Sequence, residues 1–427
     1  MSASRGSGGP LILGWPRDAA WLIGSRSARL FGNGVLSVTL ALYLAHLRLA
    51  PAAIGAVLAA GLLGGALSAV GLGQMAQRRG RRRALALSAG LGCLAALLLT
   101  TASIAWLLGL AAAIGAVSAS AQDVGSQPAL EQAAIADLVP APRRTDLFAW
   151  YSLAGSLAAA LGALVAGLPN LLGVHGAAGF GAERALVALY GAAQLAALVA
   201  YLQLSPRADG VPTPLSAAGA RRPPSRWAWT GLHRSRPTVV RLGSLFALDS
   251  FAGGVAVQGL VAYDLHLRFG LGLAALGPVF FATNVAAALS YLVAARLARR
   301  IGLLNTMVLT HLPSNVVLMA VAWAPTWPVA VALLVLRSTC SQMDVPTRQA
   351  YTMALVDPSE RSAAASATGA ARTLGAMAGP LVGGAALAAP GLGLIFLLGG
   401  GLKIGYDLAL FRLFRGVPLP AEVPAPP

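Results

Sequence analysis

Two apolar stretches end in the same motif, Tyr43-Leu44-Ala45-His46-Leu47-Arg48 and Tyr263-Asp264-Leu265-His266-Leu267-Arg268, 220 residues apart. Each is followed by a second apolar stretch that ends in an arginine pair before glycine, Arg78-Arg79-Gly80 and Arg299-Arg300-Ile301-Gly302. Further matches keep a constant offset of 217, such as Gln132 with Gln349, and Gly162 with Gly379. Six apolar stretches separate equivalent positions, so both repeats would have the same orientation in a membrane. The sequence therefore predicts a parallel duplication of a six-helix unit.

The composition agrees with a membrane protein. Of the 427 residues, 57% are apolar and 11% are charged, and the mean hydropathy is +0.72; soluble domains carry about 25% charged residues. Apolar runs of about 20 residues can cross a bilayer as helices. We place such spans near residues 22–46, 52–75, 84–103, 105–127, 145–168, 184–204, 239–263, 273–295, 304–323, 327–349, 362–386 and 391–413. The predicted fold class is all-α and polytopic, with twelve transmembrane helices.

The net charge of +17 comes from arginines that cluster between the apolar runs, as in Arg78–Arg83 and in the segment 205–237. Such clusters are typical of cytoplasmic flanks of membrane helices, and nothing between the spans is long enough for a nucleic-acid-binding module. We expect both termini in the cytoplasm. The arginine-rich, lysine-poor composition is typical of a bacterial genome of high GC content, so we expect the cytoplasmic (inner) membrane of a bacterium. The expected division is a bundle over 1–204, an Arg/Pro-rich linker over 205–237, a bundle over 238–415 and a Pro-rich tail over 416–427.

One loop carries a family signature. Residues 73–83 read Gly-Gln-Met-Ala-Gln-Arg-Arg-Gly-Arg-Arg-Arg, which resembles the loop 2–3 motif of the major facilitator superfamily, G-x-x-x-D-R-x-G-R-R/K. The residues that match or replace the motif positions are Gly73, Gln77, Arg78, Gly80 and Arg81. The resemblance implies a secondary transporter of twelve helices that works by alternating access, with this loop in a gating role. Gln77 stands where the family has an aspartate, so the charge relay of that acid must be weaker here or supplied elsewhere.

Ionisable side chains deep in a span are costly and usually mark a functional cavity. Asp249, Arg337 and Arg372 lie about ten residues into the seventh, tenth and eleventh spans, and Arg29 is slightly shallower in the first. The family resemblance implies that these spans line or flank a central cavity, to which Asn284 of the eighth span adds an amide. Three arginines against one aspartate favour an anionic or amphiphilic substrate, because guanidinium binds carboxylate or phosphate through two parallel hydrogen bonds. Asp249, the only carboxylate at this depth, is the candidate for proton coupling.

The tenth span has a polar stripe at helical spacing: Arg337, Ser341, Asp344 and Arg348. We expect one continuous helix there, loosened near its cytoplasmic end by Pro346. A weaker counterpart in the fourth span contains Asp123 and Gln127. Asp344 with Arg348, and Lys403 with Asp407, have the i,i+4 spacing of ion pairs. Glu131 and Asp137 are expected in solvent.

These features predict a transporter of a small organic solute, anionic or amphiphilic, that works alone as a monomer in the lipid bilayer and exchanges protons. Export is the expected direction, as in an efflux antiporter, because nothing resembles a sugar-uptake signature. A proton-coupled multidrug exporter of cations, with Asp249 binding the positive charge, and a transporter-like membrane sensor remain alternatives. No constellation of catalytic residues, metal ligands or cofactor-binding loops is visible in the sequence, so we expect no enzymatic activity, metal or cofactor.

Overall fold

The computed structural model describes residues 11–12, 15–139, 141–173, 176–209, 234–357, 360–389 and 392–417. Most of the expected linker and tail therefore lie outside the described residues. Before the first helix, two short strands, β1 (Leu11–Ile12) and β2 (Trp15–Pro16), pair antiparallel. All other elements with regular structure in the described ranges are helices.

The helices of the first half are α1 (Arg17–His46), α2 (Pro51–Arg79), α3 (Arg81–Thr101), α4 (Ala105–Ile114), α5 (Gln127–Leu138), α6 (Ala141–Ala166), α7 (Leu168–Leu171), α8 (Gly176–Leu202) and the 3-10 helix η1 (Pro206–Asp209). Those of the second half are α9 (Arg236–Val255), α10 (Gln258–Phe269), α11 (Leu273–Ile301), α12 (Leu303–Ala320), the 3-10 helix η3 (Val321–Trp323), α13 (Trp327–Ser338), α14 (Asp344–Leu355), α15 (Arg361–Ala386) and α16 (Leu394–Phe414). Among the described residues, nine helical segments are long and apolar enough to cross a membrane, and α4 and α13 are shorter apolar helices.

Three of the predicted spans are interrupted. The fourth divides into α4 and α5, the seventh into α9 and α10, and the tenth into α13 and α14. In the fourth span, Ser118 Oγ accepts from the backbone N–H of Ser120 at 3.2 Å, and Gly125 has φ +93°; serine side chains that bond nearby backbone compete with the helical hydrogen bonds. Pro128 and Pro346 lie in the first turns of α5 and α14, where a missing N–H is tolerated. The expectation that Pro346 loosens a continuous helix is therefore wrong, since the break precedes it.

The two halves repeat each other in backbone conformation. Gly80 joins α2 to α3 with φ +93°, and Gly302 joins α11 to α12 with φ +84°. In both turns the glycine N–H donates at 3.0 Å to the carbonyl four residues earlier. Glycine is favoured there because a side chain at positive φ would be strained. The arginine-pair motifs of the two repeats thus end equivalent helices.

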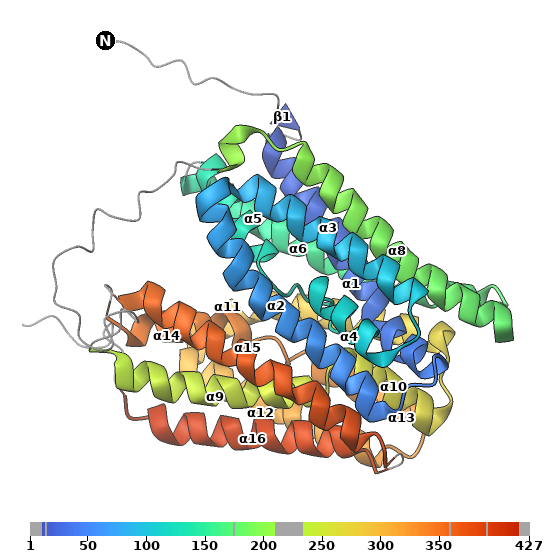
Figure 1. Cartoon of the computed structure of the whole chain (residues 1–427). Coiled ribbons are helices and arrows are strands. Elements are labelled where there is room, and N and C mark those ends of the chain that lie inside the picture. The colour runs from blue at the N-terminus through green and yellow to red at the C-terminus, as the bar shows by residue number, and fades with distance from the viewer. Residues whose placement is uncertain are drawn as a thin grey trace, which may run out of the picture.

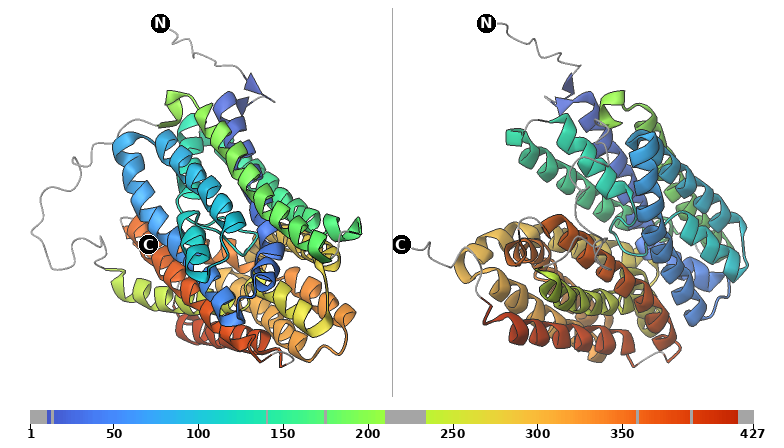
Figure 2. Two further views of the ribbon diagram at one scale, coloured as in Figure 1. Left: turned by 45° about the vertical axis from the view of Figure 1, so that its right-hand side comes forward. Right: turned by 60° about the vertical axis from the view of Figure 1, so that its left-hand side comes forward.

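The helices form two bundles. In Figures 1 and 2, the elements up to α8 lie together, and those from α9 onward form a second group beside them. Within the first, α1 packs against α6 and α8; within the second, α9 packs against α15 and α16.

The bundles contact each other near the turn between α1 and α2. There α2 crosses α15, and a Cβ on Gly55 would clash with backbone of Pro380 and Gly384. The N–H of Gly259 in α10 donates to the carbonyl of Ala119 at 3.0 Å. Figure 1 shows the bundles meeting near α10 and diverging toward α14. The halves therefore close on each other at the end far from the Gly80 and Gly302 turns.

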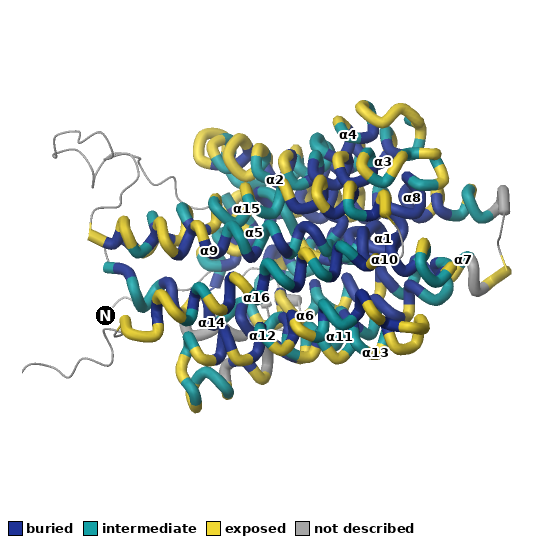
Figure 3. Tube along the Cα trace, turned by 90° about the horizontal axis from the view of Figure 1, so that it is seen from below, coloured by how far each residue is buried: buried dark blue, intermediate teal, exposed yellow. Residues whose placement is uncertain are grey.

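Burial follows the pattern of a membrane protein. In the most apolar 18-residue stretch of α1, 83% of the residues are buried. Figure 3 shows buried residues along α1 and α10 and exposed residues toward the periphery. Large apolar side chains point outward, among them Leu67 of α2. Trp106 and Trp323, equivalent at the 217 offset, are also exposed, as tryptophans in membrane-interface belts are.

Candidate functional site

A central cavity of about 390 Å³ lies between the two bundles. This size is within the usual range for small-molecule sites. The first half contributes Leu62, Ser120, Ala121, Gln122 and Val124, and none of these is charged. Among the described residues, six charged ones line it, all from the second half: Asp249, Arg337, Asp344, Arg348, Arg372 and Lys403. The cavity therefore has more cationic groups than carboxylates on its walls.

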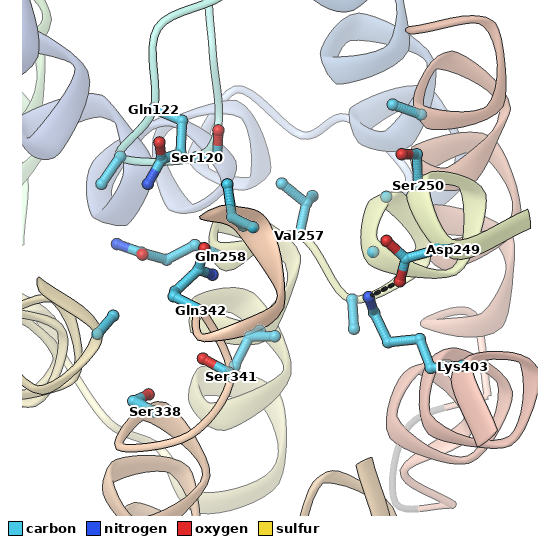
Figure 4. A pocket seen from close by; sticks show the side chains of 18 of the residues that line it. Ser120, Gln122, Asp249, Ser250, Val257, Gln258, Ser338, Ser341, Gln342 and Lys403 are labelled. Atoms are coloured by element: carbon cyan, nitrogen blue, oxygen red, sulfur yellow. Dashed lines mark hydrogen bonds and ion pairs between the residues drawn. The ribbon is translucent and has the colours of Figure 1, made fainter. Parts of the chain in front are cut away.

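Neutral polar side chains also line this cavity. Figure 4 shows the side chains of Ser120, Gln122, Gln342 and Ser341 grouped apart from the Asp249–Lys403 pair. A bound solute would thus meet hydrogen-bonding amides and hydroxyls as well as charged groups.

Asp249 is the centre of the charged wall. Its Oδ2 lies 2.9 Å from Arg348 Nη1, and its Oδ1 lies 2.5 Å from Lys403 Nζ. Arg348 also contacts Asp344 Oδ2 at 3.0 Å, the pair expected from their spacing. Lys403 was expected to pair with Asp407, and that expectation is wrong: Lys403 of α16 contacts Asp249 of the neighbouring helix α9 instead.

Asp407 instead binds His311 of α12. Its Oδ1 lies 2.8 Å from His311 Nδ1, and its Oδ2 accepts from Asn315 Nδ2 at 3.0 Å. The other ring nitrogen, His311 Nε2, lies 3.8 Å from Asp249 Oδ1. His311 is buried and lines the cavity. Sequence reasoning missed this residue, because a single histidine in an apolar span carries no partner signal.

Arg337 and Arg372 have no carboxylate partner among the described residues. Arg337 Nε is buried without a hydrogen-bond acceptor, and Arg372 Nε donates only to Ser250 Oγ, at 3.3 Å. Asn284 Nδ2 also lines the cavity without a partner. Buried donors of this kind are costly when unpaired, so an acceptor brought by a ligand would be bound strongly here.

The polar stripe of the tenth span is divided by the helix break. Arg337 lies in the last turn of α13, Ser341 in the connection, and Asp344 and Arg348 in α14. All four line the cavity, although not on one continuous helix as expected.

Arg29 lies in a separate cluster in the first half and is not among the cavity-lining residues. Its Nη1 is 2.6 Å from Asp123 Oδ1 and 3.4 Å from Gln127 Oε1, and its Nη2 is 2.6 Å from Glu131 Oε2. Glu131 is fully buried and also accepts from the hydroxyls of Ser25, Tyr151 and Tyr201 at 2.6–2.7 Å. The expectation that Glu131 is solvated is wrong, because α5 folds back along α1 and α6.

The loop 2–3 motif lies at the surface. Gln77 and Arg78 are exposed, Gly73 is half-buried, and Gly80 makes the turn described above. Arg81 Nη1 contacts Asp137 Oδ2 of α5 at 2.5 Å, and the Arg82 N–H donates to Asp209 Oδ1 of η1 at 2.8 Å. Two acids from elsewhere in the first half thus contact the loop in which the usual motif aspartate is replaced by Gln77. Its gating role stays a prediction.

Comparisons with known proteins agree with this architecture. The family model of the Major Facilitator Superfamily matches residues 22–336 and 269–427. An uncharacterized membrane protein of Saccharomyces cerevisiae, YJR124C, is 27% identical over 424 residues, which cover 94% of this chain and 95% of the yeast protein.

Solved structures show the same fold. The nucleoside transporter NupG superposes with a TM-score of 0.70 at 15% identity, covering 93% of this chain and 99% of NupG. A bacterial homologue of the human lysosomal transporter Spinster, in an inward-facing and unoccupied conformation, gives 0.69 at 16% identity, covering 93% and 96% of the two chains. The chain is a multi-pass membrane transporter and belongs to the major facilitator superfamily.

Proposed function

We propose that this transporter carries a small organic anion through the central cavity, with Arg337, Arg372 and Lys403 as its anion contacts. The observation that carries this proposal is the pair of cavity guanidiniums, Arg337 and Arg372, without a carboxylate partner in the described structure. A carboxylate, sulfonate or phosphate would supply the missing acceptors, and guanidinium can bind such groups through two parallel hydrogen bonds.

The position of the cavity agrees with a mechanism of alternating access. The cavity is between the two repeats, and the described helices of the two bundles meet near α10 and diverge toward α14. In transporters built from repeats, one bundle rocks against the other around such a site. The charge bias of the loops supports a cytoplasmic location for both termini, so the diverging end would face the cytoplasm of a bacterial cell. A single chain contains the complete cavity and would work as a monomer.

Coupling to protons is part of the proposal, with Asp249 at its centre. Asp249 is buried, lines the cavity and contacts the cations of two other helices. An anion that draws Lys403 or Arg348 away leaves this carboxylate without its counter-charge. A proton taken up at or beside Asp249 would restore the lost positive charge.

The test is a thermal-shift screen of the detergent-purified protein with matched organic anions and cations, such as naphthalene-2-sulfonate and naphthylmethylammonium. A ligand that binds only the folded state raises its stability with increasing saturation. We expect the sulfonate to stabilise the wild type and Arg412→Gln, a control that removes an exposed arginine of α16, but not Arg337→Gln.

If the cation stabilises the wild type and Arg337→Gln equally, the anion proposal is wrong. Asp249 would then be the recognition residue, and the multidrug exporter of cations would take its place. If neither solute class stabilises the protein at any concentration, a sensor without transport becomes the better description.

A further inference from the structure

The imidazole of His311 lies between two buried carboxylates of different helices. Nδ1 is 2.8 Å from Asp407 Oδ1, and Nε2 is 3.8 Å from Asp249 Oδ1. Asn315 Nδ2 holds the second oxygen of Asp407 at 3.0 Å. Asn315 Nδ2 also lies 3.2 Å from His311 Nδ1. In the tautomer that donates from Nδ1 to Asp407, Nε2 is the unprotonated nitrogen and the one nearest Asp249.

Lys403 and His311 compete for a single oxygen atom. Lys403 Nζ lies 2.5 Å from Asp249 Oδ1, the same oxygen that faces His311 Nε2. Arg348 holds the other oxygen, Oδ2. While Lys403 occupies Oδ1, a second cation at Nε2 would be repelled; once Lys403 leaves, a protonated Nε2 can donate to Oδ1 in its place.

The other charged groups near His311 are consistent with one added proton. The titratable and charged groups that face it or lie next along the wall are Asp249, Lys403, Tyr406, Asp407, Arg348, Asp344, Arg337 and Arg372. An imidazolium between two carboxylates has an anionic partner on each side, and the ring edge of Tyr406, 5.9 Å away between centroids, adds no charge.

We propose that His311 is the proton-binding site of this transporter, and that its Nε2 takes up a proton when a substrate anion draws Lys403 away from Asp249. This inference rests on the anion proposal above. The step takes one proton from solution onto Nε2, breaks the Lys403–Asp249 contact and forms an Nε2–H···Oδ1 hydrogen bond. One cation replaces another at Asp249, and the charge of the bound anion is balanced by the proton.

The consequence is co-transport. Anion and proton bind cooperatively, and by linkage each raises the affinity for the other. Both would leave together on the far side, where Lys403 returns to Asp249. In a cell with an inward proton gradient this cycle runs inward, so it replaces the export that the sequence suggested.

The experiment measures proton uptake when naphthalene-2-sulfonate binds to the purified protein in weakly buffered detergent solution with a pH-indicator dye. This probe keeps its own charge over the range in which histidine titrates, about pH 5 to 8. We expect the wild type to take up close to one proton per sulfonate bound, and its affinity to rise by up to about tenfold per unit fall in pH. His311→Gln should bind the sulfonate without uptake and without this pH dependence. The matched control, His46→Gln, removes a histidine at the C-terminal end of α1 that does not line the cavity, and it should behave as wild type.

A second measurement protects the test if His311→Gln does not fold. Nitrogen NMR of labelled histidine in the wild type should show one of the five imidazoles gaining a second proton on sulfonate binding. Sulfonate binding with no proton uptake, or with unchanged imidazoles, overturns the His311 inference alone. Failure of the sulfonate and every other anion to bind overturns the anion proposal, and this inference with it.

Discussion

The two halves contain equivalent ion pairs with reversed charges. In the first half, Arg29 of α1 binds Glu131 of α5; in the second, Asp249 of α9 binds Arg348 of α14. Arg29 and Asp249 are separated by the 220-residue offset of the Tyr-x-x-His-Leu-Arg motif, and Glu131 and Arg348 by the 217-residue offset of the following segment. Each pair joins the first helix of a repeat to the segment after a helix break.

The surroundings of the two pairs differ. Glu131 is fully buried, and its oxygens accept from one guanidinium and three hydroxyls. Asp249 lines the cavity, where Arg337 and Arg372 have no carboxylate partner in the part of the chain that the structure describes. The duplication thus kept the architecture, while one half holds a closed structural network and the other a network that a solute can rearrange.

The largest effect should come from breaking the closed network. Arg29→Met leaves Glu131 buried without a cation, and removing one partner of a buried pair costs about 3–5 kcal/mol. Reversible unfolding in mixed detergent micelles measures this loss. Arg26→Met is the matched control, because Arg26 contacts Asp123 but is partly exposed. If the two variants unfold alike, the closed network does not hold the first half together.

Asp249→Asn should destabilise the protein less, by about 1–3 kcal/mol. Arg348 still has its ion pair with Asp344 in this variant, and the ammonium group of Lys403 can be hydrated by water in the cavity. In proteoliposomes it should abolish transport driven by a pH gradient and leave exchange of anions intact. If both activities are lost although the protein folds, Asp249 is structural, and the contrast between the two networks disappears.

Much of the fold was accessible from sequence, because apolar runs and repeated motifs depend on local composition. The apolar helical segments and the repeat of the six-helix unit were predicted in this way. The three helix breaks were not predicted. In the fourth span the break lies where Ser118 Oγ accepts from the backbone N–H of Ser120, a signal too short to separate from an apolar run.

The candidate site was predicted only in part. Depth within a span identified Asp249, Arg337 and Arg372, all of which line the cavity. The depth of a residue in a span does not show which side chains contact it. Arg29 was therefore expected at the cavity, although its ion pairs with Asp123 and Glu131 place it in a separate cluster. The reversed charges of Glu131 and Arg348 at the 217 offset were the available signal that α5 and α14 carry equivalent contacts.

A smaller effect is expected from Arg372→Gln. Arg372 contacts the hydroxyl of Ser250 and has no carboxylate partner in the described structure, so its loss should leave the unfolding free energy nearly unchanged. Affinity for naphthalene-2-sulfonate should fall roughly tenfold, the value of one charge-assisted hydrogen bond. Calorimetric titration of the variant beside Arg412→Gln measures this. A clear loss of stability with unchanged affinity would instead place Arg372 in a structural network like that of Arg29.

The smallest effect on stability should come from the surface pair of Arg81 and Asp137, which is the exposed counterpart of the buried pairs. Because both side chains reach solvent, a double-mutant cycle of Arg81→Gln and Asp137→Asn should give a coupling free energy of less than about 1 kcal/mol.

A gating role of this loop would be detected by the accessibility of the cavity rather than by stability. With Cys93 and Cys340 replaced by serine and Ser341→Cys as a reporter in the cavity, Arg81→Gln should change the rate of labelling by a water-soluble maleimide, whereas Arg83→Gln should not. Equal rates in all three backgrounds would mean that the arginines of this loop set the topology of the chain and do not control access to the cavity.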